Sequence, residues 1–395
     1  MQNFAQYAPV SIYPCHDYSE NTVKSALEQV LAPLGGLDFV SKGMTIGIKA
    51  NLVSAMKPHE AATTHPALLC ALVDLLFERG AGRIIIGDSP GGLYTSAFVG
   101  HVYEATGIKA TIAHGAELNQ DLSTKEVQFP SAKVLKFFSY TAWLDTCDAI
   151  IDFCKLKSHG MMGMSAAAKN MFGVIPGTMK PEYHFRFPNM GDFSDMLIDI
   201  NDYFAEKVKL CLVDAVDGME GNGPTQGTPR HIGLLLASMS PHTVDLVCGH
   251  LLGLSPDAVP TLVSATNRGY IPADVGSLAL FMGNDTLPPH QLDSLVIKDF
   301  EHIAVRHSLL FESRGKLIGG VIRSLLNAKP KLYAKDCIGC GKCANICPAK
   351  AIVIKDKKAI INRSACIRCF CCQEFCPTGA MKVHRTWVAQ LLVKG

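Results

Sequence analysis

CIGCGKCANICP, residues 337–348, places four cysteines in the order C-x2-C-x2-C-x3-C and follows the last one with a proline. A second stretch, CIRCFCCQEFCP at 366–377, repeats this array 29 residues later. Aligning the two stretches selects four of the five cysteines in the second, namely Cys366, Cys369, Cys372 and Cys376. Cys371 is left over. The segment is therefore an internal duplication of one short unit.

This pattern resembles the bacterial ferredoxin that binds two [4Fe-4S] clusters. In that protein the fourth cysteine of each array binds the cluster of the other array. Carried onto this chain, the resemblance assigns one cluster to Cys337, Cys340, Cys343 and Cys376. It assigns the other cluster to Cys366, Cys369, Cys372 and Cys347.

The spacing has a physical reason, because three thiolates two residues apart can wrap a tight loop around one cluster. Gly339 and Gly341 let the backbone approach closely in the first array, whereas Arg368 and Phe370 occupy the matching positions in the second. Structural zinc and disulfides are the alternatives, but zinc sites usually separate their C-x2-C pairs by a dozen residues or more. Cys371 is then a free thiol beside the cluster or an alternative ligand in place of Cys372.

Length and composition indicate two units, because 395 residues exceed one ordinary core. We expect a body over residues 1–329 and a cluster module over 330–395, with Pro330 marking the linker after a helical, mixed-charge segment at 298–327. Neither a signal peptide nor an apolar run of about 18 residues is visible, which predicts a cytoplasmic protein with no membrane partner. Reduced cysteines fit such a compartment and favour an anaerobic or microaerobic host.

The net charge of +2 conceals a split between the two units. Residues 331–395 hold twelve Lys and Arg against three Asp and Glu, and the rest of the chain holds 25 against 32. Two clusters, each with about two negative charges, leave the module at roughly +5. We therefore expect it to dock on an acidic surface, either the body or an electron donor such as ferredoxin or flavodoxin. Nucleic acid is disfavoured because the basic residues lack interleaved aromatics.

The body alternates short apolar runs with helical patterns. The pattern predicts strands at 44–50, 83–89, 149–156, 209–216 and 231–238, and helices at 66–80, 192–204 and 241–253. Strands that are apolar on both faces and lie between helices indicate an α/β fold with a mostly parallel sheet. The cluster module is expected to be a small α+β domain of the bacterial-ferredoxin type.

Ligands of such sheets bind beyond the carboxyl ends of the strands. The polar residues at those places are Lys49, Asn51, Asp88, Lys155, Lys157, His159, Asp214 and Asp217. The segment 155–187 adds further basic residues among glycines and apolar residues, with few acids. This composition predicts a concave basic site for a small anionic substrate, a carboxylate or a phosphate; the alternative is a surface loop with incidental charges.

Four residues of this region are candidates for catalysis. His159 and His184 can each exchange a proton near neutral pH, although a single histidine is more often structural. Lys157 and Lys169 can anchor substrate charge or, if desolvated, act in acid–base chemistry. The loop at 214–230 brings Asp214, Asp217 and Glu220, whose carboxylates hold a divalent ion, neutralise the lysines opposite or are simply solvated. The DSPGG turn at 88–92 is neither a P-loop nor a dinucleotide fingerprint.

Four stretches of the body together resemble the family called domain of unknown function 362. They are KANLV (49–53), GAGRIIIGDSPGG (80–92), KLKSHGMMGMSAAAKNMFGVIPG (155–177) and DAVDGMEGNGPTQGTPR (214–230). The resemblance implies an iron–sulfur protein of anaerobic metabolism and supplies no reaction. The recurrent polar residues of that family correspond here to Lys49, Asn51, Asp88, Lys155, Lys157, His159, Lys169, Asn170, Asp214, Asn222 and Asp245.

Our leading hypothesis is a ferredoxin-dependent reductase whose clusters feed electrons to an anionic substrate or cofactor in a basic cleft of the body. Lys157 and Lys169 would hold the anion, and His159 or His184 would deliver protons. The residues expected to bind the substrate or cofactor are Lys49, Asn51, Asp88, Lys155, Asn170, Asp214 and Asn222. A flavin is conceivable, but no motif demands it. The rival hypotheses are an electron-transfer or maturation protein, whose body docks a partner, and a non-redox enzyme with structural clusters.

Overall fold

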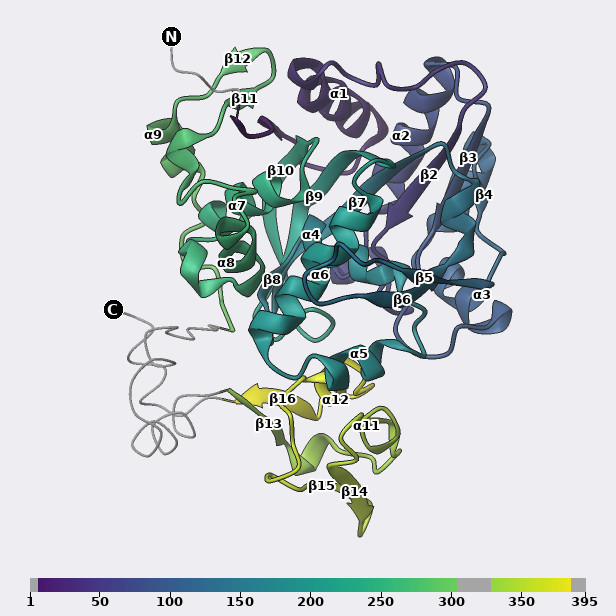
Figure 1. Ribbon diagram of the computed structural model, residues 1–395, viewed down its shortest axis with the longest axis vertical. Helices are drawn as coiled ribbons and strands as arrows, with labels where there is room; N and C mark the ends of the chain where they lie inside the picture. Colours follow the sequence, from purple (N-terminus) through teal and green to yellow (C-terminus); the bar gives the residue numbers. More distant parts are fainter. Residues whose placement is uncertain (1–5, 304–327, 385–395) are drawn as a thin grey trace.

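The computed structural model of the chain describes residues 6–303 and 328–384. Figure 1 shows a large body, and below it a small module formed by the C-terminal residues. The strands of the body are β1 (Val10–Pro14), β2 (Thr45–Ala50), β3 (Arg83–Gly87), β4 (Glu117–Leu118), β5 (Thr124–Gln128), β6 (Phe137–Thr141), β7 (Ala149–His159), β8 (Gly163–Ser165), β9 (Val208–Glu220), β10 (Thr228–Ser238), β11 (Leu280–Met282) and β12 (Asp285–Thr286).

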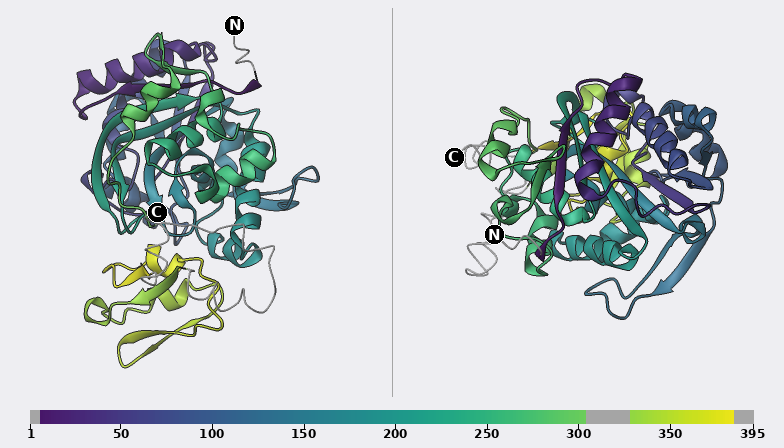
Figure 2. Two further views of the ribbon diagram at one scale, coloured as in Figure 1. Left: turned by 90° about the vertical axis from the view of Figure 1, so that its left-hand side faces the viewer. Right: turned by 90° about the horizontal axis from the view of Figure 1, so that it is seen from above.

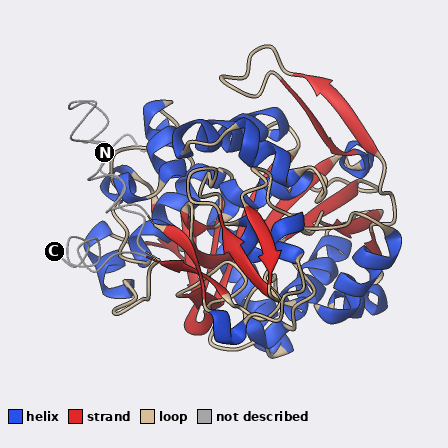
Figure 3. Cartoon of the chain, turned by 90° about the horizontal axis from the view of Figure 1, so that it is seen from below, coloured by secondary structure: helices blue, strands red, loops and turns tan. Residues whose placement is uncertain are grey.

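Within the described residues, one ten-stranded sheet runs in the order β12-β11-β1-β10-β9-β7-β2-β3-β4, with β8 paired to β7. The five strands from β9 to β4 are parallel to one another. The other half is mixed, because β10 is antiparallel to both β9 and β1. The strands β5 and β6 form a separate antiparallel hairpin that extends from one side of the body (Figures 2 and 3).

Helices cover both faces of the sheet. Those of the body are α1 (Glu20–Leu31), α2 (Pro66–Glu78), α3 (Ser96–Ala105), α4 (Ala167–Asn170), α5 (Lys180–Arg186), α6 (Met190–Phe204), α7 (Pro241–Leu251), α8 (Pro260–Asn267) and α9 (Pro289–Leu292). One apolar core joins α1, α2 and α3 to one sheet face. Two further cores join α6, α7 and α8 to the other face, so the central strands are buried on both sides.

The cluster module consists of two small antiparallel sheets and two single-turn helices. β13 (Lys329–Leu332) pairs with β16 (Met381–His384), and β14 (Ile352–Lys355) pairs with β15 (Lys358–Ile361). The helices α11 (Lys342–Asn345) and α12 (Cys371–Glu374) each contain the third cysteine of an array. In Figure 1, α12 and β16 lie next to the body, and the β14–β15 hairpin lies on the far side.

The predicted α/β body and small C-terminal module are confirmed. The sequence did not reveal that Thr228–Ser238 returns antiparallel to the preceding strand, because an apolar strand looks the same in either direction. Pro330 lies within β13 and not in a linker. Most of the predicted helical segment at 298–327 lies outside the described residues. Within residues 6–303 and 328–384, every helix is too short or too polar to cross a bilayer.

Candidate functional site

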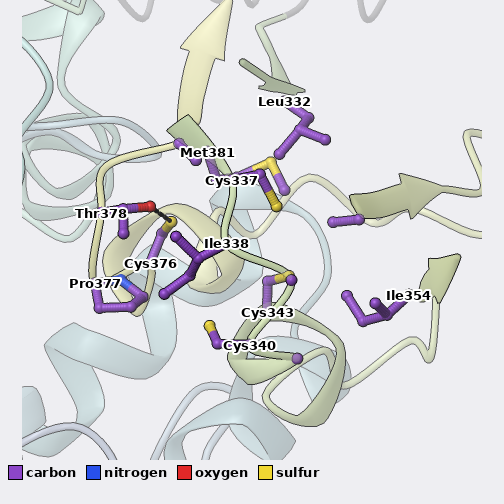
Figure 4. Close-up of a pocket in the computed structure, with 14 residues that line it drawn as sticks. Leu332, Cys337, Ile338, Cys340, Cys343, Ile354, Cys376, Pro377, Thr378 and Met381 are labelled. Carbon is purple, nitrogen blue, oxygen red and sulfur yellow. Dashed lines mark hydrogen bonds between the residues drawn. The ribbon is translucent and has the colours of Figure 1, made fainter. Parts of the chain in front are cut away.

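The cysteines assigned to the first cluster surround one hollow of about 330 Å³ in the module. Cys337 and Cys340 come from the loop before α11, Cys343 lies within α11, and Cys376 comes from the end of the second array. Figure 4 shows their sulfur atoms turned toward the same space, with Ile338 and Ile354 beside it. The structure therefore brings the fourth cysteine of the second array to the first three of the first array.

The second hollow has nearly the same size, about 310 Å³, and the complementary set of cysteines. Its lining includes Cys347 from the first array and Cys366, Cys369 and Cys372 from the second. The amide of Ala351 donates a hydrogen bond of 3.2 Å to the sulfur of Cys347. Cys371 also lines this hollow. The geometry is therefore compatible with Cys371 as a free thiol and with Cys371 as an alternative ligand.

Both hollows fit an iron–sulfur cluster by their donor chemistry. Each is lined by four thiols that are not drawn together around one ion, whereas a tetrahedral zinc ion draws its sulfur ligands to about 2.3 Å. Within the described ranges, no three His, Cys, Asp or Glu side chains are placed to hold a single metal ion. Four cysteines around a wide hollow are the arrangement that a [4Fe-4S] cluster uses.

The two cysteine loops share an unusual backbone conformation. Gly339 and Gly341 have φ values of 69° and 78°, and Arg368 and Phe370 repeat this with 60° and 63°. A non-glycine residue in this left-handed region costs about 1–2 kcal/mol. Phe370 is nevertheless held there because its ring is buried in an apolar core of the body that also contains Phe172. The bulkier second loop thus attaches the module to the body.

Close contacts join the body and the module. A Cβ added at Gly91 would lie 2.6 Å from the ring of Phe375, so only glycine lets this ring approach. The side chain of Gln373 donates to the carbonyl of Asn222 at 2.8 Å, and Asn222 Oδ1 accepts from the amide of Val383 at 3.3 Å. Asn222, expected at the anion site, therefore lies in the contact between the two units.

Lys49 lies in a buried polar network at the end of β2. Its ammonium group forms an ion pair of 2.8 Å with Asp88, and both side chains are buried. Asn170 accepts from Asn51 at 2.8 Å and donates to Asp152 at 2.6 Å. These residues come from four segments and fix one another's positions. The network therefore supports the site from within the body and is not an open surface.

Asp152 was missed by the sequence analysis, although an acid inside the apolar strand AIIDFCKL is a visible signal. Burial raises the pKa of its carboxyl group to about 7. One of its oxygens, Oδ2, has no hydrogen-bond partner within the described part of the chain.

Lys157 is also buried, and its ammonium group donates to Asn51 Oδ1 and to the carbonyl of Ala62, both at 2.6 Å. Burial lowers the pKa of Lys157 to about 7, and the nearby charges of Lys169 and Lys155 act in the same direction. A lysine with such a pKa can exchange a proton at neutral pH. The lowered pKa of Lys157 thus gives its predicted acid–base role a physical basis.

Lys155 and Asp214 form a second buried pair, in which Nζ lies 2.7 Å from Oδ2 and neither side chain is exposed. Tyr18 accepts a hydrogen bond from Lys155 at 3.0 Å and donates one to Asp214 at 3.1 Å. The amide of His65 donates to the same carboxylate at 3.0 Å. Every polar atom of this pair has a protein partner, so the pair fixes β7 against β9.

The carboxylates of Asp217 and Asp245 pair with other groups of the body, although the backbone carbonyl of Asp217 accepts a hydrogen bond of 3.0 Å from Lys155. Asp217 pairs with the exposed His231 at 2.8 Å. Asp245 accepts from the amides of Ala167 and Ala168 at the start of α4, and burial raises its pKa to about 8. Both carboxylates therefore have partners within the body, and neither contacts Lys169.

His159 reaches the cluster module from the end of β7. Its Nδ1 accepts hydrogen bonds from the amides of Met161 and Met162, so the ring proton resides on Nε2. Nε2 lies 3.3 Å from Glu374 Oε1 but makes no well-directed hydrogen bond. Burial lowers the pKa of His159 to about 4. His159 is thus neutral and faces the carboxylate of α12.

Glu374 is the residue around which the candidate site gathers, and the sequence analysis missed it. Burial raises the pKa of its carboxyl group, but His159, Lys169 and His184 outweigh that effect and lower the pKa to about 2. Glu374 lies between two cluster ligands in the sequence, and its backbone carbonyl accepts from Thr225 of the body. It is therefore a negative charge that the module inserts among basic residues of the body.

The charge of this carboxylate also acts on two lysines of the 155–187 segment, Lys169 and Lys180. The ammonium groups of Lys169 and Lys180 lie 6.0 and 5.9 Å from the centre of the Phe172 ring. Lys180 donates to the carbonyl of Ser89, and burial lowers its pKa to about 8. Burial also lowers the pKa of Lys169, which has no hydrogen bond or ion pair to any described residue. An incompletely paired positive charge therefore lies beside Glu374.

His184 completes this group. Its ring stacks on Phe193 with 4.4 Å between centres, and burial lowers its pKa to about 3. Its Nδ1 is buried and has no partner among the described residues. The predicted candidates Lys169, His159 and His184 are thus brought together, with Lys180 and Glu374 in addition. We call this set the junction site: His159, Lys169, Lys180, His184 and Glu374.

Comparison with known proteins gives two family matches. Residues 46–250 match the model described as domain of unknown function (DUF362), and residues 336–380 match that of the 4Fe-4S dicluster domain. A thylakoid-associated protein of Synechocystis sp. is 30% identical over 271 residues, which are 67% of this chain and 80% of that protein.

Two solved structures resemble the chain only distantly. A protein from Thermotoga maritima aligns with a TM-score of 0.36 and 13% identity, over 54% of this chain and 53% of its own length. The lactate racemase apoprotein from Thermoanaerobacterium thermosaccharolyticum aligns with a TM-score of 0.42 and 11% identity. That alignment covers 64% of this chain and 58% of the racemase, so the chain spans little more than half of either structure.

Proposed function

The chain belongs to the DUF362 family and carries a 4Fe-4S dicluster domain, and from this premise we propose that it is an iron–sulfur oxidoreductase. When bound, two [4Fe-4S] clusters would supply electrons one at a time. The electrons would pass to a small anionic substrate or cofactor held at the junction site. A flavin is one candidate for that cofactor.

The observation that carries the proposal is the position of α12. This helix contains Cys372, which lines the second hollow, and Glu374, which faces the basic residues of the body. The second cluster and the junction site therefore lie on the two sides of a single helical turn. An electron acceptor bound at this place would lie close to the cluster, as electron transfer requires.

The charges of the junction site favour an anion. Lys169 and Lys180 bring two ammonium groups to one phenyl ring, whereas Glu374 is the facing carboxylate. Burial of the lysines lowers their pKa values, which means that the protein stabilises these charges poorly. A bound anion would provide the missing compensation. The free Nδ1 of His184 could accept a hydrogen bond from the same molecule.

Anaerobic isolation of the holoprotein tests this proposal. Mass spectrometry of the released small molecules, together with flavin, iron and sulfide analysis, is expected to find a bound anion with about eight irons per chain. Lys169→Gln should weaken the binding of that anion at least tenfold and thereby lower its occupancy, because removing a partner from a charged pair costs about 1.4 kcal/mol or more. The iron content should stay unchanged.

Lys209→Gln is the matched control, because Lys209 is an exposed lysine of the same body on β9. It should retain both the anion and the iron. An empty wild-type protein, or equal occupancy in the two variants, would favour an electron-relay or maturation role instead.

The pKa of Lys180 predicts how anion binding depends on pH. Since its pKa is about 8, the side chain of Lys180 is mostly charged below pH 8 and mostly neutral above it. Sulfate is a suitable probe because its charge does not change in this range. Its dissociation constant, measured by calorimetry, should rise by roughly tenfold from pH 7 to pH 9. Lys180→Met should bind sulfate weakly and with a smaller pH dependence; an unchanged pH profile in that variant would contradict the assignment.

A further inference from the structure

The two hollows of the cluster module differ in their exposure. Among the eight cysteines assigned as ligands, all within the described residues, Cys340 of the first hollow is the exposed one. Three cysteines of the second hollow are buried, namely Cys347, Cys369 and Cys372. The second hollow adjoins the body, so an electron from outside would reach the first cluster more directly.

Apolar side chains are exposed at the mouth of the first hollow. Ile338 is 65% exposed and Ile354 is 36% exposed, and both line the hollow (Figure 4). Ile354 belongs to the β14–β15 hairpin, which lies on the side of the module away from the body (Figure 1). The body therefore leaves these two isoleucines uncovered.

Exposed lysines lie near the residues of this mouth, in the sequence or in space. Residues 334–358 contain six lysines and two aspartates, with no other charged residue. Lys335 precedes the first cysteine by two residues, Lys342 lies between Cys340 and Cys343, and the backbone of Lys357 packs against Gly339. All three lysines are exposed. A small apolar centre with a positive rim results.

We propose that this surface docks an acidic one-electron carrier protein, and we call it the entry face: Lys335, Ile338, Cys340, Lys342, Ile354 and Lys357. One electron leaves the reduced carrier and reduces the first cluster, while no bond forms and no proton moves. The lysines would attract the carrier and orient it, and the isoleucines would exclude water where the two redox centres approach. The inference requires only that the clusters carry electrons, and not that an anion binds at the junction site.

A carrier protein fits this face better than an anionic membrane. Electron-transfer partners form small interfaces, below about 1,200 Å², and release quickly. Two isoleucines suffice for the centre of such a contact, whereas a membrane-binding surface usually inserts more apolar and aromatic side chains. The entry face also includes Cys340, the exposed cluster ligand. Covering this ligand would serve electron transfer, whereas it has no role in membrane binding.

Reduction of the full-length holoprotein by a purified, reduced flavodoxin of acidic charge tests the inference. The triple variant Lys335→Glu, Lys342→Glu and Lys357→Glu should be reduced roughly 10- to 100-fold more slowly at low ionic strength, and should bind oxidised flavodoxin correspondingly more weakly. The control is Lys42→Glu, Lys209→Glu and Lys298→Glu, three exposed lysines of the body that change the net charge equally. This control should slow reduction less than about threefold.

Three outcomes would overturn the inference. Equal slowing of the two triple variants would show that only net charge matters. A wild-type rate that does not fall with added salt would show that the lysines do not attract the carrier. Entry-face changes that abolish binding to phosphatidylglycerol vesicles, while leaving reduction by flavodoxin unchanged, would show a membrane-binding surface. Since no substrate is present in these measurements, failure of the junction-site proposal would leave their result unaffected.

Discussion

Lys155→Met is expected to lower the free energy of unfolding by about 3–5 kcal/mol, because it leaves the carboxylate of Asp214 buried without its cation. Neither side chain is exposed, and their charged atoms lie 2.7 Å apart. Tyr18 and the amide of His65 would still donate hydrogen bonds to Asp214, but they carry no compensating charge. Anaerobic urea unfolding, followed by circular dichroism, measures the change.

Lys24→Met is the matched control. Lys24 pairs with Glu78 at 2.6 Å, but these side chains are 40% and 55% exposed. An exposed pair contributes less than about 1 kcal/mol, so this variant should unfold almost like the wild type. The double variant Lys155→Met and Asp214→Asn should recover part of the loss, since it removes the buried charge. Equal effects of the two lysine changes would refute the structural role of the Lys155–Asp214 pair.

Cys372→Ser is expected to remove about four of roughly eight irons per chain, whereas Cys371→Ser should retain all of them. Both cysteines line the second hollow, but only Cys372 occupies the position that the duplicated array assigns to a ligand. Serine preserves the size of each side chain and removes the thiolate. Iron and sulfide analysis of the anaerobically purified variants gives the result.

A third variant tests the exchange of ligands between the arrays. Cys347→Ser changes the first array, yet Cys347 lines the second hollow. It should therefore remove the same cluster as Cys372→Ser and give the same electron paramagnetic resonance spectrum after reduction. Loss of half the iron from Cys371→Ser would mean that Cys371 is a ligand, and the assignment of Cys372 would fall.

Much of the fold could be predicted because its signals are local. MTIGIKA and RIIIGDS form β2 and β3 as expected, since their apolar runs are bounded by turn residues. The resemblance of the duplicated arrays to a two-cluster ferredoxin likewise implied which cysteines share a hollow. The strand direction of β10 was not predictable, because pairing direction depends on the connection and not on the composition of the strand.

The candidate site was predicted only in part, because its partners are distant in the sequence. Lys49, Lys155 and Lys157 were expected around a basic cleft, and in the structure all three are buried and contact protein groups. Tyr18 lies 196 residues from Asp214, and the sequence around Tyr18 does not indicate the hydrogen bond between them. Glu374 lies between two cysteines of the second array, and the sequence around it does not indicate its contact with basic residues of the body. Charge patterns in one stretch cannot show which of its lysines a distant carboxylate will neutralise.

The position of β1 has a consequence for the order in which the body folds. Val10–Pro14 lies inside the sheet, between β10 and β11, and its partners begin at Leu234 and Leu280. During synthesis this strand stays without its sheet partners until more than 200 further residues have left the ribosome. Contacts of such long range close slowly and expose apolar edges in the meantime. Early chains of this protein should therefore depend on chaperones until the strand is captured between its two neighbours.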